Sequence, residues 1–91
     1  MKLVYQSSAL ADLQNIHQYI SKDSPDIAAT VIARIKSSLD RLTTFPRSGR
    51  PGNVPRTYEV VVPNLPYIVV YELTNNEIEI VAVFHGAQDR P

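Results

Sequence analysis

The alternation of apolar and polar residues divides the chain into a short strand, two helices and three further strands. Residues 2–6 alternate around Leu3 and Tyr5, which predicts a short strand. Apolar residues then recur at three- and four-residue steps in two longer segments, one ending near Lys22 and one ending before Pro46, which predicts two amphipathic helices. Their apolar stripes consist of Leu10, Leu13, Ile16 and Ile20, with His17 at the edge, and of Ala28, Val31, Ile32, Ile35, Leu39 and Leu42.

The residues between the two stripes carry the signals of a helix start. Ser24 is expected to cap the second helix, Pro25 fits its first turn because the φ angle is preset, and Asp26 complements the helix dipole. Ser7 or Ser8 is expected to cap the first helix with its hydroxyl. Because the break between the helices is short, they are predicted to form an antiparallel hairpin.

The chain after the second helix is predicted to form a loop and then three strands. Residues 46–55 contain three Pro and two Gly, a composition typical of a loop. Strands are predicted at Thr57–Val62, Tyr67–Leu73 and Glu77–Phe84. The order is therefore β-α-α-β-β-β, and the predicted fold class is α+β, a helical hairpin packed on a small antiparallel sheet in a single domain of residues 1–91.

The last two strands are apolar on both faces. A hairpin of helices covers only one face of a sheet, and the other face of such a sheet is usually polar. Alternation assigns Tyr67, Val69, Tyr71 and Leu73 to one face of their strand, and Ile78, Ile80, Ala82 and Phe84 to one face of the last strand. The residues expected to lack cover are Ile68, Val70, Val81 and Val83. Either a second copy of the chain or another protein is predicted to cover them.

Composition narrows the class of protein. Nine Lys and Arg balance nine Asp and Glu, so the whole domain lacks the strong positive charge typical of nucleic-acid-binding domains. The absence of Cys excludes disulfides, Cys-ligated zinc, iron–sulfur clusters and thiol catalysis. The sequence has no apolar run long enough to cross a bilayer and no pattern of a secretory leader at its start, so a cytoplasmic location is expected.

The charge is concentrated in the middle of the chain. Residues 34–56 carry six basic residues against one acid, so this segment is predicted to present an anion-attracting surface. Arg47 and Arg50 lie in the predicted loop and Arg56 opens a strand, which makes these three the candidate contacts to a target. The alternative is that they only keep the loop hydrated.

Motifs of cofactor or nucleophile chemistry are missing. His17 and His85 have no partners at metal-ligand spacing, and the three glycines form no phosphate-binding pattern, so no cofactor and no metal are predicted. A general acid–base site acting on RNA stays open: the arginines could hold phosphates, and His85 or Tyr71 could move a proton.

A series of short motifs along the chain resembles the RelE/ParE superfamily of toxins from bacterial type II toxin–antitoxin systems. The motifs are Ala9-x-x-Asp12-Leu13-x-x-Ile16-x-x-Tyr19-Ile20, Leu42-x-x-Phe45-Pro46-x-x-Gly49-Arg50-Pro51, Arg56, Pro66-Tyr67-Ile68-Val69-Val70-Tyr71 and Ile78-x-Ile80-x-x-Val83-x-His85-Gly86. They cover nearly the whole chain. The resemblance implies the same β-α-α-β-β-β order that the residue pattern predicts.

The resemblance also suggests which branch of the superfamily applies. Members similar to RelE cleave messenger RNA on the ribosome, and they usually carry an Arg at the position of Ile68 and a basic or His–Tyr tail. This chain has Ile68 there and ends Ala-Gln-Asp-Arg-Pro91. It therefore looks like the ParE branch, which inhibits DNA gyrase and is not known to need a catalytic residue. Arg47, Arg50, Arg56 and His85 are the predicted target contacts.

The same resemblance implies a partner. Toxins of this kind are neutralised by a ParD-like antitoxin, commonly with a ribbon–helix–helix DNA-binding half, so DNA is expected to be contacted only through the antitoxin or gyrase. An acidic and apolar antitoxin tail would complement the basic middle and the apolar surface at Ile68, Val70, Val81 and Val83. A RelE-like ribonuclease and a degenerate, non-toxic antitoxin-binding member stay open as alternatives, as does a homodimer; no membrane partner is expected.

Overall fold

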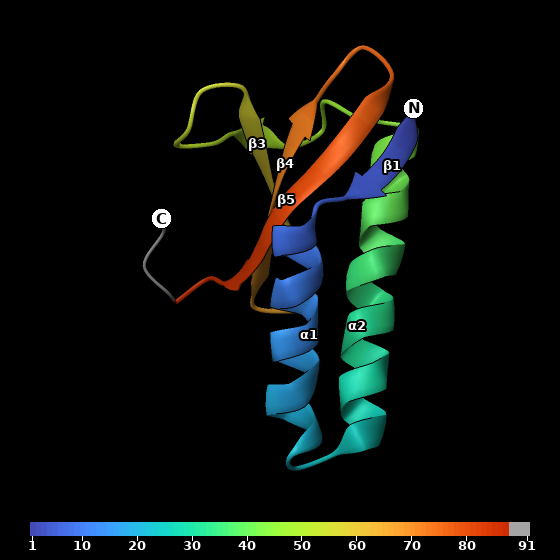
Figure 1. Ribbon diagram of the computed structural model, residues 1–91, viewed down its shortest axis with the longest axis vertical. Helices are drawn as coiled ribbons and strands as arrows, with labels where there is room; N and C mark the ends of the chain where they lie inside the picture. The colour runs from blue at the N-terminus through green and yellow to red at the C-terminus, as the bar shows by residue number, and fades with distance from the viewer. Residues whose placement is uncertain (88–91) are drawn as a thin grey trace.

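The computed structural model describes residues 1–87 and contains two helices packed against one face of a sheet (Figure 1). The element order confirms the α+β, β-α-α-β-β-β prediction, with one short strand and one short 3-10 helix added before the last three strands. The elements are β1 (Lys2–Tyr5), α1 (Ser7–Ser21), α2 (Pro25–Asp40), the 3-10 helix η1 (Arg41–Thr43), β2 (Arg50–Pro51), β3 (Thr57–Val61), β4 (Tyr67–Leu73) and β5 (Glu77–His85).

The sheet is mixed, whereas the sequence predicted an antiparallel one. Its strand order is β1-β5-β4-β3-β2, and β1 pairs parallel to β5 with Leu3 opposite Ile78 and Tyr5 opposite Ile80. The other three pairings are antiparallel. The prediction was wrong for β1 because alternation of apolar residues indicates a strand but carries no information about its direction beside a neighbour far away in the chain.

The predicted loop of residues 46–55 contains the short edge strand β2. Arg50 lies opposite Glu59 and Pro51 opposite Tyr58. Proline has no N–H to donate, so it is tolerated at the edge of a sheet where one side needs no partner. The strand was not predicted because the Pro and Gly residues of this segment are typical of a loop.

The two helix starts differ. The Ser24 hydroxyl accepts a hydrogen bond from the Ile27 N–H at 3.2 Å, with Pro25 as the first helical residue, as predicted. Neither Ser7 nor Ser8 caps α1, which starts at Ser7 without a side-chain cap. The Ser8 hydroxyl donates instead to the Val81 carbonyl oxygen at 2.6 Å, so a tertiary contact with β5 replaces the predicted local one.

A β-bulge in β5 changes which of its residues face the helices. Val70 pairs with Ala82 but Tyr71 pairs with Ile80, so Val81 is an extra residue without a partner position on β4. One extra residue reverses the alternation beyond it. Ile80 therefore faces the helices before the bulge and Val83 faces them after it, whereas Ala82 and Phe84 lie on the outer face.

Because of the bulge, the prediction of which residues lack cover is partly wrong. Val83 is only 3% exposed and belongs to the core, so its assignment to the free face was wrong. Ile68 does lie on the outer face but is only 8% exposed. The turn after β5 folds back beside it, because the Gly86 N–H donates to the Pro66 carbonyl oxygen at 2.7 Å and the Gly86 Cα region borders the Ile68 side chain. Val70 and Val81 are half-buried.

Candidate functional site

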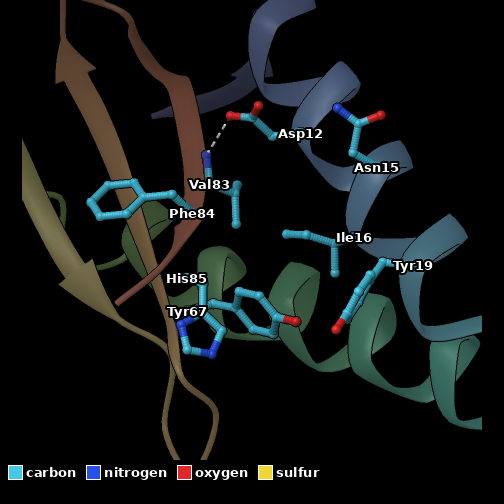
Figure 2. A pocket seen from close by; sticks show the side chains of 8 residues that line it. All are labelled: Asp12, Asn15, Ile16, Tyr19, Tyr67, Val83, Phe84 and His85. Atoms are coloured by element: carbon cyan, nitrogen blue, oxygen red, sulfur yellow. Dashed lines mark hydrogen bonds between the residues drawn. The ribbon is translucent and has the colours of Figure 1, made fainter. Parts of the chain in front are cut away.

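A cleft of about 430 Å³ opens between α1 and the adjoining ends of β4 and β5 (Figure 2). Helix α1 supplies one wall with side chains three or four residues apart, which share one helix face. The strands supply the opposite wall. The lining residues are Asp12, Asn15, Ile16 and Tyr19 from α1, Tyr67 from β4, and Val83, Phe84 and His85 from β5.

Asp12 ties the two walls of the cleft together. Its Oδ2 accepts a hydrogen bond from the Val83 N–H at 2.9 Å, drawn as a dashed line in Figure 2. β1 pairs with β5 only as far as Tyr5 and Ile80, so beyond that point α1 takes the place of a neighbouring strand. Ser8, one helical turn before Asp12, bonds the Val81 carbonyl oxygen in the same way. Two side chains of α1 thus cover this stretch of the β5 edge.

The strand wall of the cleft is aromatic. The rings of Tyr67 and His85 meet edge to face, with centroids 5.8 Å apart and an interplanar angle of 82°. Burial raises the pKa of the Tyr67 phenol, and the neighbouring Tyr19 adds to the increase. The phenol therefore stays neutral and able to both donate and accept.

A backbone hydrogen bond orients the His85 ring. Its Nδ1 accepts a hydrogen bond from the Ala87 N–H at 3.0 Å, so the neutral ring carries its proton on Nε2. Figure 2 shows the ring at the lower end of the cleft beside Tyr67. His85, a predicted target contact, thus lies at the cleft wall with Nδ1 bonded to the backbone of the following turn.

A second candidate surface is the loop that carries the predicted arginines. Tyr71 is fully buried, and its hydroxyl donates to the Pro46 carbonyl oxygen at 2.9 Å and accepts from the Gly49 N–H at 3.0 Å. Its ring stacks on that of Tyr58, with centroids 5.4 Å apart. One buried phenol therefore holds the start of the loop against the sheet.

The three arginines have different surroundings. Arg50 Nη2 lies 3.4 Å from Glu59 Oε1, and its side chain is 59% exposed while that of Glu59 is 4% exposed. Arg56 is exposed and has a φ of 70°, a left-handed conformation that is unusual for a residue with a Cβ. Arg47 is exposed as well. The loop between β2 and β3 that ends at Arg56 projects from the sheet at the upper left of Figure 1.

The structure does not bring His85 to these arginines. Thr57, next to Arg56, pairs with Glu72, which pairs with Glu79, whereas His85 lies six residues further along β5. At roughly 3.3 Å per residue this places His85 about 20 Å from the end of the sheet that carries Arg56. Arg56 and His85, two of the four predicted target contacts, therefore lie on separate surfaces.

The four predicted antitoxin contacts do not form one surface either. Val70 and Val81 line a small outer-face cleft of about 150 Å³, together with Phe84, Glu59 and Glu72. Ile68 and Val83 do not line it. Only Val70 and Val81 of the four thus present apolar surface on the outer face.

Sequence reasoning about chemistry missed the polar residues of the large cleft. Asp12 and Tyr19 appear in the helix motif, and their spacing with Asn15 predicts a shared helix face, but nothing in the sequence indicated that this face opens beside His85. Within residues 1–87, no three His, Asp or Glu side chains gather in an arrangement that could hold a metal ion. None of the helices in this part of the chain is long and apolar enough to cross a membrane.

The fold and the sequence both match known toxins. The family described as the ParE toxin of type II toxin–antitoxin systems, parDE, matches residues 3–90. A protein of Sinorhizobium fredii named as a toxin, Y4kP, is 45% identical over 83 residues, which is 91% of this chain and 85% of the relative. Toxin RelE2 of Caulobacter vibrioides is 34% identical over 87 residues, covering 96% of this chain and 97% of that protein.

Solved structures agree on the fold. The chromosomal ParDE toxin–antitoxin system from P. aeruginosa contains a chain with a TM-score of 0.83 at 24% identity, covering 93% of this chain and 95% of that one. The intact E. coli RelBE toxin–antitoxin complex contains one with a TM-score of 0.69 at 18% identity, covering 98% of each chain. The two-helix, mixed-sheet fold is therefore that of a bacterial toxin of a type II toxin–antitoxin system. This chain belongs to the ParE toxin family.

Proposed function

We propose that this toxin acts by binding DNA gyrase and not by cleaving RNA. The supporting observation is the make-up of the cleft at His85, which holds the Asp12 carboxylate and, among its described lining residues, no Lys or Arg. A carboxylate repels the phosphates of RNA, and a phosphate in the cleft would meet no Lys or Arg among the lining residues that the structure describes.

The chemistry of RNA cleavage needs groups that this chain keeps apart. Attack by the 2′-hydroxyl requires a base, an acid for the leaving oxygen and a cation at the charged transition state. His85 could exchange a proton, but Arg56 lies at the other end of the sheet. The Tyr71 hydroxyl is buried and already bonds Pro46 and Gly49. Ile68, at the position where RelE-like members carry Arg, is apolar and only 8% exposed.

The arginine loop is the surface that we assign to gyrase. Arg47 and Arg56 are exposed and carry charge on a loop that Tyr71 anchors, which is a common arrangement for binding residues. Arg50 is partly engaged by Glu59, so replacing Arg50 would mix a loss of binding with a loss of stability. Arg47 and Arg56 are therefore the sharper test positions.

The second part of the proposal is neutralisation by a cognate antitoxin. The structural neighbours from P. aeruginosa and E. coli come from toxin–antitoxin systems, and this chain has their fold. Val70 and Val81 supply half-buried apolar surface on the outer face and stay the antitoxin contacts that we propose there. A second copy of the chain is the alternative occupant.

The test uses the purified, antitoxin-free chain in two assays. Supercoiling by DNA gyrase should be inhibited or cleaved DNA should accumulate, whereas messenger RNA on translating ribosomes should stay intact. Arg56→Ala should weaken gyrase inhibition several-fold to about a hundredfold, the range of a charge-assisted contact. Lys22→Ala, which removes a cation at the far end of α1, is the control. Cleavage of ribosome-bound messenger by substoichiometric protein would overturn the proposal and favour the RelE-like alternative.

A further inference from the structure

We propose that the cleft between α1 and β5 is a binding pocket for an arginine side chain of the antitoxin. The proposal rests on the antitoxin partnership proposed above and adds a site and a chemistry to it. The pocket residues that carry the argument are Asp12, Asn15, Ile16, Tyr19, Tyr67 and His85.

The first argument is charge. The described lining carries the Asp12 carboxylate and no cationic Lys or Arg to balance it. Asp12 Oδ2 accepts from the Val83 N–H, and no hydrogen bond within the described residues uses the other oxygen. A partly buried carboxylate with an unused oxygen at a cleft wall attracts a cationic donor and disfavours an anion.

The second argument is the set of neutral groups around that carboxylate. Asn15 offers an amide on the same helix face, and the hydroxyls of Tyr19 and Tyr67 make no hydrogen bond to another described residue. Figure 2 shows Tyr67 and Tyr19 on opposite sides of the cleft, with their hydroxyl groups directed toward each other and Ile16 above them. An arriving donor with several N–H groups could therefore meet several acceptors.

The third argument is shape, which favours arginine over lysine. A guanidinium is planar, presents five donors and stacks on aromatic rings, whereas an ammonium is a compact and strongly hydrated point charge. The cleft combines two phenol rings, an imidazole and an apolar side chain that suits an aliphatic stem. Its volume of about 430 Å³ leaves room for a whole side chain with some water.

The docking mode is insertion of a side chain and not addition of a strand at this edge. Ser8 and Asp12 already bond the Val81 carbonyl and the Val83 N–H, so an added strand would have to displace both. The antitoxin is the assigned source because Arg56, the exposed contact that we propose for gyrase, lies at the opposite end of the sheet, about 20 Å away. Two partners can then engage different ends of the molecule.

The experiment measures dissociation of the complex between this toxin and the protein encoded by the adjacent reading frame. Asp12→Asn keeps an oxygen that can accept from the Val83 N–H while removing the charge, so the wall of the cleft is retained. We expect it to weaken the complex about ten- to a hundredfold. Tyr19→Ala should weaken it as well, and because Tyr19 is 72% exposed the toxin should remain folded.

Two comparisons give the result its specificity. Asp23→Asn makes the same chemical change on the exposed turn between the helices and should leave the affinity unchanged. Each antitoxin Arg is then changed to Gln against both wild-type toxin and Asp12→Asn. For one Arg, the change to Gln should lower the affinity for wild-type toxin about tenfold or more and lower the affinity for Asp12→Asn only a little. A general effect of charge would lower both affinities alike.

Three outcomes would overturn the proposal. The first is unchanged antitoxin affinity in both Asp12→Asn and Tyr19→Ala. The second is that no antitoxin Arg couples to Asp12. The third is that Asp12→Asn lowers gyrase inhibition or dissociates a dimer of the free toxin while antitoxin affinity stays constant, which would make gyrase or a second copy the occupant. Gyrase inhibition is assayed on free toxin, whereas the pocket is tested by antitoxin affinity. A wrong gyrase proposal can therefore be distinguished from a wrong pocket proposal.

Discussion

The Asp12 carboxylate accepts a hydrogen bond from the Val83 backbone N–H at 2.9 Å, across 71 positions of the chain. Val83 follows the bulge at Val81, so its N–H points toward α1 at a place where β1 has already ended. A helix side chain thus replaces a strand at this edge. The contact joins α1 to β5 at the wall of the cleft.

Asp12→Ala should destabilise the fold more than Asp12→Asn. Alanine leaves the Val83 N–H without its acceptor, which costs about 1–3 kcal/mol, whereas Asn can still accept. Urea unfolding followed by circular dichroism checks the order of the two variants. Equal stability of Asp12→Ala and wild type would mean that water substitutes fully for the carboxylate.

Gly49→Ala should destabilise the arginine loop and the fold. A Cβ at Gly49 would lie 2.6 Å from the Tyr71 hydroxyl oxygen and 2.8 Å from the Glu59 carbonyl oxygen, so the loop would have to move away from its anchor. We expect a loss of about 1–3 kcal/mol in thermal or urea unfolding. Gly86→Ala is the matched control, because its nearest neighbour would be 3.4 Å away and the change should be tolerated.

Arg56→Gly should stabilise the protein while weakening gyrase inhibition. Arg56 has a φ of 70°, which glycine adopts without the cost of a Cβ, so relief of about 1 kcal/mol is expected. The charge that we assign to gyrase contact is lost at the same time. Arg56→Ala removes the charge without relieving the backbone, so the two variants should inhibit gyrase equally poorly and differ in melting temperature. Full inhibition by Arg56→Gly would show that this charge is not a contact.

Stability should fall at alkaline pH through the buried tyrosines. Burial raises the pKa of Tyr71 above its ordinary value of about 10, and burial does the same for Tyr67. Because each phenol ionises more easily in the unfolded chain, the stabilisation is fully present below pH 10 and is lost as the pH rises through the folded pKa. Urea midpoints measured from pH 8 to 12 check this.

Tyr71→Phe separates this effect from general charge repulsion. The variant should be less stable near neutral pH because the bonds to Pro46 and Gly49 are lost, yet its stability should depend less on pH above 10. Tyr58→Phe is the control, since it keeps the ring stacked on Tyr71 and leaves the Tyr71 hydroxyl with its bonds to Pro46 and Gly49. An unchanged pH profile in Tyr71→Phe would contradict the prediction.

The helices and the order of elements along the chain could be predicted because their signals are local. The Ser24-Pro25-Asp26 start of α2 is a set of neighbouring residues that satisfy the first helical turn by themselves, and the structure has it as expected. Strands β3, β4 and β5 agree with their predictions to within one residue because each is a run of β-branched and aromatic residues between turn residues. The turn before β4 includes Asn64 at a φ of 63°, a conformation that Asn tolerates.

The sequence by itself determined the two helices, four of the five strands, the family motifs and the basic middle of the chain, since each of these depends on residue type and spacing. Only the tertiary structure decided the direction of β1, the bulge at Val81 and the meeting of Asp12 with Val83 and His85 with Tyr67. A bulge inserts one residue into the pairing of two strands, and nothing in the β5 residues alone marks which one. The burial of Val83 and the opening of the cleft follow from that pairing, so they could be learned only from the strands in contact.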